Sequence, residues 1–421
     1  MRSVPRVVQQ RKLRERITGV DYHLWDKLAE DNGTKIVYLV IDGVGGLAIP
    51  ERGQSELQAA HLPNLDDLAA RSATGLLEIV GPGITPGSGP GHLSLFGYDP
   101  LEYTVGRGVL AALGTDFPLQ PADVAARANF ATIDERGNIV DRRAGRISTE
   151  TNERLCAKIR DNIRMEGVEV FFQPVKEHRA LLVLRGEGLA GNLIDTDPQV
   201  TGVPPLEPQA TNPEGERTAA LVREFVGQVR EILADEYPAN MILLRGFDRY
   251  ERYPSITERF KLRGLSIAAY PMYRGVTKLI GMDLHPVVSD MAGRFEALEA
   301  AYGDDYDFYF LHVKQADARG EDGDFDAKVK VLEQVDALVP RLTALEPDVL
   351  VVTGDHSTPC ALQSHSWHPV PVILHSRNAR VDDVDRFDEY ACARGSLGLR
   401  PGVHLMGLVL AHAGRLMKYG A

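Results

Sequence analysis

The chain has 421 residues, of which 44% are hydrophobic and 25% charged, a balance that is typical of a folded globular protein and excludes disordered and fibrous classes. No apolar run approaches the ~20 residues that cross a bilayer, and a net charge of −12 argues against nucleic acid or an anionic membrane as a partner. Cys156, Cys360 and Cys392 form no CxxC pair, so we expect neither a disulfide framework nor a thiolate zinc site, and we expect a cytoplasmic protein.

The chain opens with a basic segment, residues 1–34, which lacks the apolar stretch of a secretory signal and is interpreted as a solvated arm. Residues 35–40 are apolar and predict a strand, which is followed at once by Asp42 and Gly43. Apolar residues then recur at helical spacing over residues 61–73. Asp42 is therefore either a metal ligand at the end of a strand or simply a turn former.

Glycine and proline dominate residues 81–91, which are too irregular for a helix or a strand and indicate a functional loop. Ser88 lies in this loop with a glycine on each side, where a helix is expected to begin. The glycines leave room for a bulky phosphoryl group, and the first N–H groups of the helix would point at it. The alternative role of Ser88 is an ordinary helix N-cap.

The sequence pattern changes between about residues 117 and 285. Strand-like segments such as 180–185 stand among charged helices such as 216–234. Ligand-like loops lie on both sides of this stretch. We therefore predict an inserted α+β cap domain, residues 117–285, and a first domain made of residues 35–116 and 286–421.

The last third of the chain alternates between strands and helices. Strands are predicted at residues 306–312, 349–353 and 370–375, and helices at residues 285–302 and 326–344. Such alternation is typical of a parallel sheet. The predicted fold is therefore α/β, a mostly parallel sheet sandwiched by helices, with the α+β cap inserted in it.

Carboxylate and imidazole groups follow the strand-like runs. They are Asp42, Asp317, Asp355, His356 and His365. Loops that leave the carboxyl ends of strands meet at one crevice in an open α/β sheet, so we expect these side chains to meet there. Together with Ser88 they indicate a two-metal site beside a nucleophilic serine, because paired cations stabilise attacking and leaving oxygens. His368 and His375 are interpreted as packing or surface residues.

Glu321 lies four residues after Asp317, a spacing that places both carboxylates on one side of a helical turn and suits a divalent cation. The acidic residues that come next, Asp322, Asp324 and Asp326, are interpreted as a solvated helix start. A serine hydroxyl needs a base or a cation to become a nucleophile. Metal-assisted phosphoryl transfer is therefore the chemistry that this pattern favours.

Longer segments carry a resemblance to a known family. They are PGSGPGHLSLFGYDP, the GRG at 106–108, DVAARANFAT, DRRAGRIST, IAAYPMYRGVTKLIGM, GDHSTP and HSWHPVPV. From about residue 35 to its end the chain resembles the archaeal-type cofactor-independent phosphoglycerate mutases of the alkaline phosphatase superfamily. The resemblance implies an alkaline-phosphatase-like fold. It also implies interconversion of 3-phosphoglycerate and 2-phosphoglycerate through a phosphoserine, without bisphosphoglycerate.

The resemblance implies roles for single residues as well. Ser88 matches the phosphorylated nucleophile of the family. The ligands that share one cation with that serine are Asp42, Asp355 and His356. The ligands of the other cation are Asp317, His365 and Glu321. Glu321 stands where the family usually has a histidine, and a carboxylate there hardens the site. Two Mn²⁺ ions are expected, with Zn²⁺, Co²⁺ or Mg²⁺ as alternatives.

The substrate's carboxylate and phosphate are expected to be held by arginines of the inserted domain through paired hydrogen bonds. These arginines are Arg142, Arg143, Arg146, Arg245 and Arg274. Lys278 and Lys314 are further candidates of the same kind. A cap that closes over the phosphoserine would exclude water and so prevent hydrolysis.

Other activities remain open at this point. They are a phosphatase, a phosphonate hydrolase or a homoserine-kinase-like enzyme of the same superfamily, and a regulatory or binding protein built on a decayed mutase fold. The intact set of Ser88 and its neighbouring ligands argues against decay. The oligomeric state is not predicted.

Overall fold

A computed structural model describes residues 23–303 and 305–420. Most of the predicted basic arm therefore lies outside the described residues. The chain divides into two units, which are described separately. The first unit holds the described residues up to Tyr103, together with Pro254–Ile267 and those from Gly281 onward, and the second unit consists of Thr104–Tyr253 and Ala268–Ile280.

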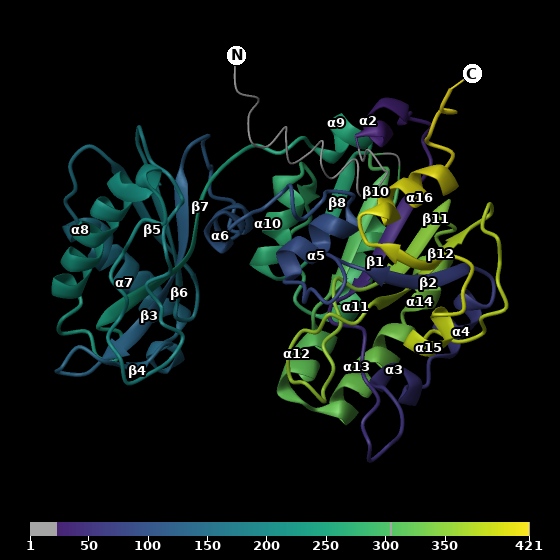
Figure 1. The fold of residues 1–421 in the computed structure, drawn as a ribbon, viewed down its shortest axis with the longest axis horizontal. Helices are drawn as coiled ribbons and strands as arrows, with labels where there is room; N and C mark the ends of the chain where they lie inside the picture. Colours follow the sequence, from purple (N-terminus) through teal and green to yellow (C-terminus); the bar gives the residue numbers. More distant parts are fainter. Residues whose placement is uncertain (1–22, 304, 421) are drawn as a thin grey trace. The chain divides into compact units, whose positions relative to one another are not determined.

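The first unit is built on an eight-stranded sheet with the order β13-β2-β12-β11-β1-β10-β8-β9 (Figure 1). The strands are β1 (Ile36–Ile41), β2 (Ala73–Glu78), β8 (Gly264–Ile267), β9 (Asp283–Leu284), β10 (Phe308–Val313), β11 (Val349–Thr353), β12 (Val370–Ser376) and β13 (Gly398–Pro401). Neighbouring strands from β9 through β11 run parallel, whereas β12 is antiparallel to both β11 and β2. The mostly parallel sheet and the strands that were predicted around residues 36, 308, 349 and 370 are confirmed.

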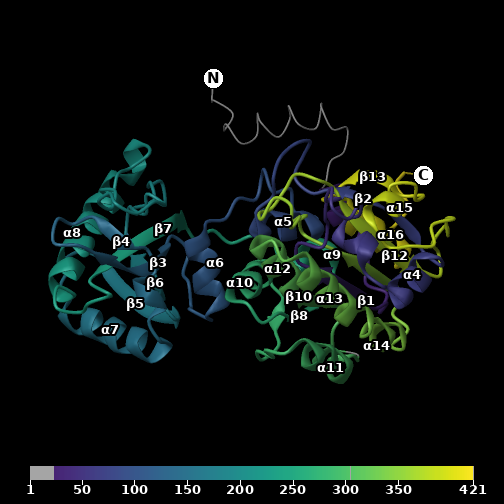
Figure 2. The same ribbon diagram turned by 90° about the horizontal axis from the view of Figure 1, so that it is seen from below.

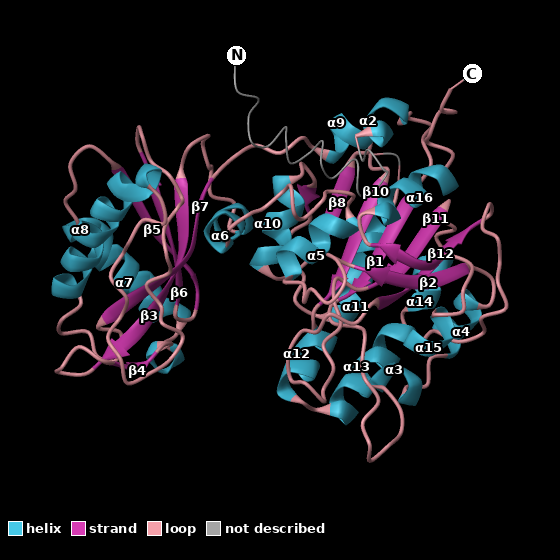
Figure 3. Ribbon diagram, viewed as in Figure 1, coloured by secondary structure: helices cyan, strands magenta, loops and turns pink. Residues whose placement is uncertain are grey.

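Helices flank this sheet (Figures 2 and 3). They are α2 (Leu24–Leu28), α3 (Glu56–Ala59), α4 (Pro63–Ala69), α5 (Ser88–Leu95), α9 (Ile256–Phe260), α11 (Met291–Ala301), α12 (Gln315–Asp322), α13 (Phe325–Asp336), α14 (Val339–Thr343), α15 (Glu389–Cys392) and α16 (His404–His412). Alternate side chains of a strand point to opposite faces. Accordingly Phe310 contacts the rings of His92 and Phe96 on α5, whereas Tyr309 contacts Tyr302 at the end of α11. Both faces of the sheet are thus covered, which explains why β1 and β10 are apolar and completely buried.

The second unit has a five-stranded sheet with the order β4-β3-β6-β5, and β7 pairs with β3. All the pairings are antiparallel. The strands are β3 (Val124–Ile133), β4 (Ile139–Asp141), β5 (Glu169–Lys176), β6 (Arg179–Arg185) and β7 (Met241–Arg249). The helices are α6 (Arg107–Gly114), α7 (Thr149–Asn162), α8 (Glu216–Ile232) and α10 (Pro271–Leu279), with short 3-10 turns at Ala144–Arg146 and Pro213–Gly215.

One face of this second sheet packs against α7 and α8. Its core includes Phe130 of β3, Leu182 of β6, Leu155 of α7 and Phe225 of α8. Helices α6 and α10 pack closely on each other, and α6 also contacts β3 and β7. A Cβ added at Gly275 of α10 would lie 2.1 Å from the carbonyl oxygen of Leu110 on α6, so this helix pair requires glycine at its contact.

The observed boundaries of the units differ from the predicted 35–116, 117–285 and 286–421. Helix α6 belongs to the second unit because it packs on β3, β7 and α10. Strand β8 belongs to the first unit because it pairs in parallel with β10. The α+β insertion is therefore entered twice by the chain, at Thr104–Tyr253 and again at Ala268–Ile280.

None of the described helices combines the length and the apolar composition that a membrane crossing requires.

Candidate active site

The topology of the first sheet explains why ligand-type residues gather at one edge. Strands β1, β10 and β11 are parallel neighbours, so Asp42, Asp317 and Asp355, which follow them, lie at the same edge. Strand β12 runs the other way, so His365, which precedes it, reaches that edge as well. Gly43 makes the turn after Asp42 with a φ of 67°, and a Cβ there would lie 2.8 Å from the Cα of Asp317. The Asp-Gly pair therefore forms a turn and also permits close approach of the next loop.

Asp42, Asp355 and His356 form a first group whose ligand atoms all lie within 4.8 Å of one another. Nε2 of His356 is 3.3 Å from Oδ1 of Asp42 and 3.2 Å from Oδ2 of Asp355. All three side chains are completely buried. The hydroxyl of Ser88 lies beside this group, with Oγ 3.4 Å from Nε2 of His356.

Ser88 is the first residue of α5, and Gly87 is the N-cap. No side chain caps this helix, so the alternative role of Ser88 as an N-cap is excluded. The Oγ atom is instead turned toward His356.

Asp317, His356 and His365 form a second group of the same kind. Oδ1 of Asp317 lies 3.4 Å from Nε2 of His365 and 3.9 Å from Nδ1 of His356, and the two imidazole rings stack with centroids 3.6 Å apart. His356 thus belongs to both groups, through a different nitrogen in each. Glu321 lies outside the group: its side chain is 54% exposed, and its Oε1 is 3.9 Å from Nε2 of His365.

Two further histidines lie against the carboxylates of the first group. The sequence patterns did not predict these contacts. Nε2 of His312 lies 3.3 Å from Oδ2 of Asp42, and Nδ1 of His92 lies 3.3 Å from Oδ2 of Asp355. His92 is four residues after Ser88 on α5, a helical spacing that could have identified it. His312 lies on β10, and only the register of that strand beside β1 brings it to Asp42.

Two more residues bind the carboxylate of Asp317. The ammonium group of Lys314 forms an ion pair with it and lies 3.3 Å from Asp42, so Lys314 belongs to the ligand cluster. The hydroxyl of Thr358 donates a hydrogen bond to Oδ1 of Asp317 at 2.6 Å and lies 3.0 Å from Nδ1 of His356. Thr358 therefore orients a member of each group.

The protonation states and missing hydrogen bonds of this cluster are those expected of a site for divalent cations. Burial and the neighbouring carboxylates of Asp42 and Asp317 raise the pKa of Asp355 well above its ordinary value. Burial lowers the pKa of His356 to about 4, so its imidazole is neutral and one of its two nitrogens is available as a ligand. The four carboxylate oxygens of Asp42 and Asp355 are buried and receive no hydrogen bond of normal geometry from the described residues. Buried carboxylates of this kind are normally paired or bound to a metal, so the residues present fit divalent cations.

The five predicted substrate arginines do not form one cluster. Arg142 makes a two-point ion pair with Asp197 at 2.8 and 2.7 Å, and Arg245 lies 3.5 Å from the same carboxylate. Arg143 and Arg146 are exposed in the turn after β4. Arg274 is 6% exposed and lies 3.9 Å from Asp116.

A different set of cationic residues shares one face of the second sheet. Arg127 of β3 lies opposite Arg245 of β7, and Asn129 lies opposite Arg179 of β6. Because residues two apart on a strand share a face, Arg127 and Asn129 point the same way. We call Arg127, Asn129, Arg179 and Arg245 the arginine face.

The arginine face holds polar atoms that are buried without a hydrogen bond. They are Nε of Arg127, Oδ1 of Asn129 and Nε of Arg245. Burial lowers the pKa of Arg127 to about 10, and the nearby Arg107, Arg245 and Arg179 add to the shift. A group of arginines with unbonded donor atoms favours the binding of an anion such as a carboxylate or a phosphate. Sequence reasoning missed Arg127 and Arg179 because only the strand register brings them together, and it missed Arg107 because that residue comes from α6, which packs on β3.

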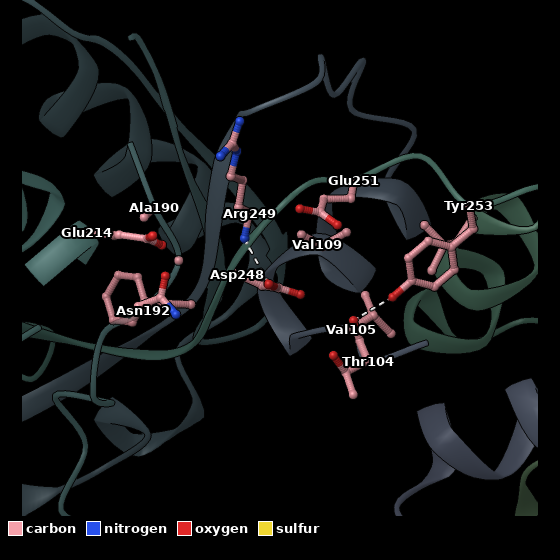
Figure 4. A pocket seen from close by; sticks show the side chains of 13 residues that line it. Thr104, Val105, Val109, Ala190, Asn192, Glu214, Asp248, Arg249, Glu251 and Tyr253 are labelled. Carbon is pink, nitrogen blue, oxygen red and sulfur yellow. Dashed lines mark hydrogen bonds between the residues drawn. The ribbon is translucent and has the colours of Figure 1, made fainter. Parts of the chain in front are cut away.

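A pocket of about 440 Å³ lies elsewhere in the second unit (Figure 4). None of the predicted ligand or substrate residues lines it. At its wall Asp248 accepts a hydrogen bond from the N–H of Gly106 at 2.5 Å. Tyr253 donates a hydrogen bond to the carbonyl of Thr104 at 2.5 Å, as Figure 4 shows. These hydrogen bonds join two segments of the chain within the second unit, so the wall residues named here have a structural role.

Comparisons with known proteins agree with the motifs. A sequence model of 2,3-bisphosphoglycerate-independent phosphoglycerate mutase matches residues 69–240. A probable enzyme of that name from Thermus thermophilus is 52% identical over 399 residues, which cover 94% of this chain and 98% of the relative. A relative from Aquifex aeolicus, also named as probable, is 47% identical over 404 residues, covering 94% and 99%.

Solved structures show the same likeness. The cofactor-independent phosphoglycerate mutase of Thermoplasma acidophilum is 31% identical, with a TM-score of 0.69 over 90% of this chain and 100% of that one. A protein of Pyrococcus horikoshii, 28% identical, superposes with a TM-score of 0.80 over 92% and 99% of the two chains. The chain therefore belongs to the 2,3-bisphosphoglycerate-independent phosphoglycerate mutase family, and the resemblance seen in its motifs is confirmed.

Proposed function

We propose that this protein interconverts 3-phosphoglycerate and 2-phosphoglycerate through a phosphoserine at Ser88, without bisphosphoglycerate. The observation that carries the proposal is the position of the Ser88 hydroxyl beside two buried ligand groups that share His356. Membership of the mutase family supports this reading over the phosphatase and kinase-like alternatives. Since the reaction belongs to glycolysis and gluconeogenesis, we place it in the cytoplasm.

The proposed cofactors are two divalent cations, with Mn²⁺ as our first choice because the donors combine carboxylates with neutral imidazoles. Asp42, Asp355 and His356 would hold one cation together with Ser88. Asp317 and His365 would hold the other, with Glu321 as the remaining partner. When bound, the cations would neutralise phosphoryl oxygens and lower the pKa of the attacking hydroxyl.

The chain's own residues account for the transfer. In this transfer Oγ of Ser88 loses its proton and forms a bond to phosphorus as the bond from phosphorus to the substrate oxygen breaks, and that oxygen takes up a proton to become a hydroxyl. The first N–H groups of α5 would point toward the phosphoryl group. The phosphoryl group then returns to the other hydroxyl of the same glycerate. No water is consumed, so exclusion of water separates a mutase from a phosphatase.

The arginine face is the proposed site for the substrate's carboxylate. Nε of Arg127 is buried and has no hydrogen bond with the described residues, so an anion would complete it. Nε of Arg245 is also buried without a hydrogen bond, but it already lies 3.5 Å from the carboxylate of Asp195. Arg142 is a weaker candidate than sequence reasoning suggested, because Asp197 already engages it at two points. Arg143, Arg146 and Arg274 remain proposed contacts.

The test is to incubate the Mn²⁺-loaded protein with 3-phosphoglycerate and follow both products. Appearance of 2-phosphoglycerate without free phosphate supports the mutase. Release of free phosphate alone would establish a phosphatase and reject the proposal. A parallel incubation with a chelator should show no turnover.

A further inference from the structure

A buried ion pair lies behind the loops that carry the candidate ligands. Lys328 of α13 and Glu56 of α3 are both completely buried, and Nζ of Lys328 is 3.9 Å from Oε1 of Glu56. Neither residue belongs to a ligand group. Removing two charges from water carries a desolvation cost, so a buried pair of this kind contributes little to stability by itself.

Lys328 touches two ligand loops at once. Its ammonium group donates hydrogen bonds to the carbonyl oxygen of Gly45 at 3.0 Å and to that of Thr358 at 2.8 Å. Gly45 lies three residues after Asp42, and Thr358 lies two residues after His356. One side chain therefore fixes the distance between the loop after β1 and the loop after β11.

The carboxylate of Glu56 forms hydrogen bonds with the same two loops. Its Oε1 accepts a hydrogen bond from the N–H of Cys360 at 2.7 Å, and its Oε2 accepts one from the N–H of Leu47 at 3.2 Å. Glu389 of α15 adds a further bond, since its Oε1 accepts from the N–H of Gly46 at 2.6 Å. Backbone N–H and carbonyl groups of both loops are thus bonded to charged side chains, of which Lys328 and Glu56 are completely buried and Glu389 is half-buried.

The loops also bond directly to each other and to the loop of His365. The N–H of Thr358 donates to the carbonyl of Gly45 at 3.1 Å, and the N–H of Ser366 donates to the carbonyl of Ser357 at 2.9 Å. The hydroxyl of Thr358 in turn holds Asp317. A displacement at Lys328 would therefore reach ligands of both groups.

We propose that Lys328 and Glu56 are positioning residues that set the affinity of both ligand groups for divalent cations. The inference rests on the two-cation site of the proposed function. Support for ligands from residues that do not touch the metal commonly governs metal affinity.

The experiment is calorimetric titration of Mn²⁺ into metal-free, full-length Lys328→Met, with urea unfolding of the same metal-free protein. We expect Mn²⁺ affinity to fall about tenfold. The matched control is Arg415→Met. Arg415 is also completely buried, but it bonds to Thr34 and faces Asp307, which precede β1 and β10 at the opposite edge of the sheet.

Weaker Mn²⁺ binding in Lys328→Met, with wild-type affinity in Arg415→Met at a comparable loss of stability, supports the inference. Wild-type affinity in Lys328→Met overturns it, and so does an equal loss of affinity in both variants. If Lys328→Met does not fold, Glu56→Gln decides by the same criterion, since the amide can accept only one of the two backbone bonds. Failure of the wild-type protein to bind Mn²⁺ would reject the proposed function itself, and the inference with it.

Discussion

The ligand loops of the first unit and the arginine face of the second unit are opposite in charge but alike in one respect. Among the described residues, the carboxylate oxygens of Asp42 and Asp355 in these loops are buried and receive no hydrogen bond of normal geometry, and Nε of Arg127 on the arginine face is buried and donates none. Buried polar groups are normally satisfied, so exceptions of this kind indicate bound partners. The first region is suited to cations and the second to an anion. The following experiments perturb one region or the other and measure the effect on metal binding, turnover or stability.

The largest effect is expected from Ser88→Ala, which removes the proposed nucleophile from the first unit. Turnover of 3-phosphoglycerate should fall by about 10³-fold or more. Mn²⁺ binding, measured by calorimetry, should persist because the carboxylate and imidazole ligands remain. Substantial mutase activity in this variant would contradict the phosphoserine route.

His356 and His365 should differ in what they do to metal binding. His356→Ala removes a member of both groups, so Mn²⁺ should bind about 100-fold more weakly at both. His365→Ala removes a member of one group only and should leave one tight site. Calorimetric stoichiometry distinguishes the two, and identical behaviour of the variants would show that His356 is not shared.

Arg127→Met tests the second unit. Loss of a charged hydrogen bond to the substrate should cost about 2 kcal/mol, which is roughly a 30-fold rise in KM. Mn²⁺ affinity should not change. The stability of the protein in urea should hold or increase, because the variant removes a half-buried cation whose buried Nε has no hydrogen bond with the described residues. A rise in KM together with a loss of Mn²⁺ affinity would contradict the prediction that the arginine face binds the substrate and does not affect the metal site.

His178, which is buried next to Arg179 in the second unit, should contribute to the pH dependence of the unfolding free energy. Burial lowers its pKa to about 4, and the charge of Arg179 adds to the shift. A base with a lowered pKa in the folded state takes up its proton on unfolding, so its contribution to stability is complete above about pH 6.5 and is lost as the pH falls toward 4. The unfolding free energy of the wild type should therefore decrease by about 1–2 kcal/mol more than that of His178→Gln over this range. Parallel pH profiles for the two proteins in urea would show that the imidazole is not desolvated.

The smallest effect is expected from Glu321→His, because the Glu321 side chain is half exposed and lies outside the second ligand group. Replacing an oxygen ligand by an imidazole should shift the ratio of Zn²⁺ to Mn²⁺ affinity toward Zn²⁺ by about threefold to tenfold. Competition titrations measure this ratio. An unchanged ratio would show that Glu321 takes no part in metal binding.

The sequence predicted that the candidate ligand residues lie together, because their positions follow from a simple rule. Asp42, Asp317 and Asp355 each come after an apolar run, and parallel strands deliver such residues to one edge of a sheet. The position of His356 in both groups was not predicted, because the resemblance implied that His356 is a ligand of one cation only. The structure instead places one imidazole between the two groups.

The second unit was harder to predict. The side chains of Arg127, Arg179 and Arg245 meet through antiparallel register, and single-strand patterns carry no information on which residues face each other across a sheet. The limits of the two units differ from the predicted domain limits for a similar reason. Strand β8 has only four residues, and nothing in its local pattern shows that it pairs with β10.

The two nitrogens of His356 make the ligand groups dependent on each other. A neutral imidazole carries one proton, so when Nε2 serves as a ligand toward Asp42 and Asp355 the proton resides on Nδ1, which faces Asp317 and Thr358. The tautomer selected at one group thus decides whether the other group meets a donor or an acceptor. If both groups bind cations as proposed, their occupancy is linked through this single proton, and such linkage is reciprocal.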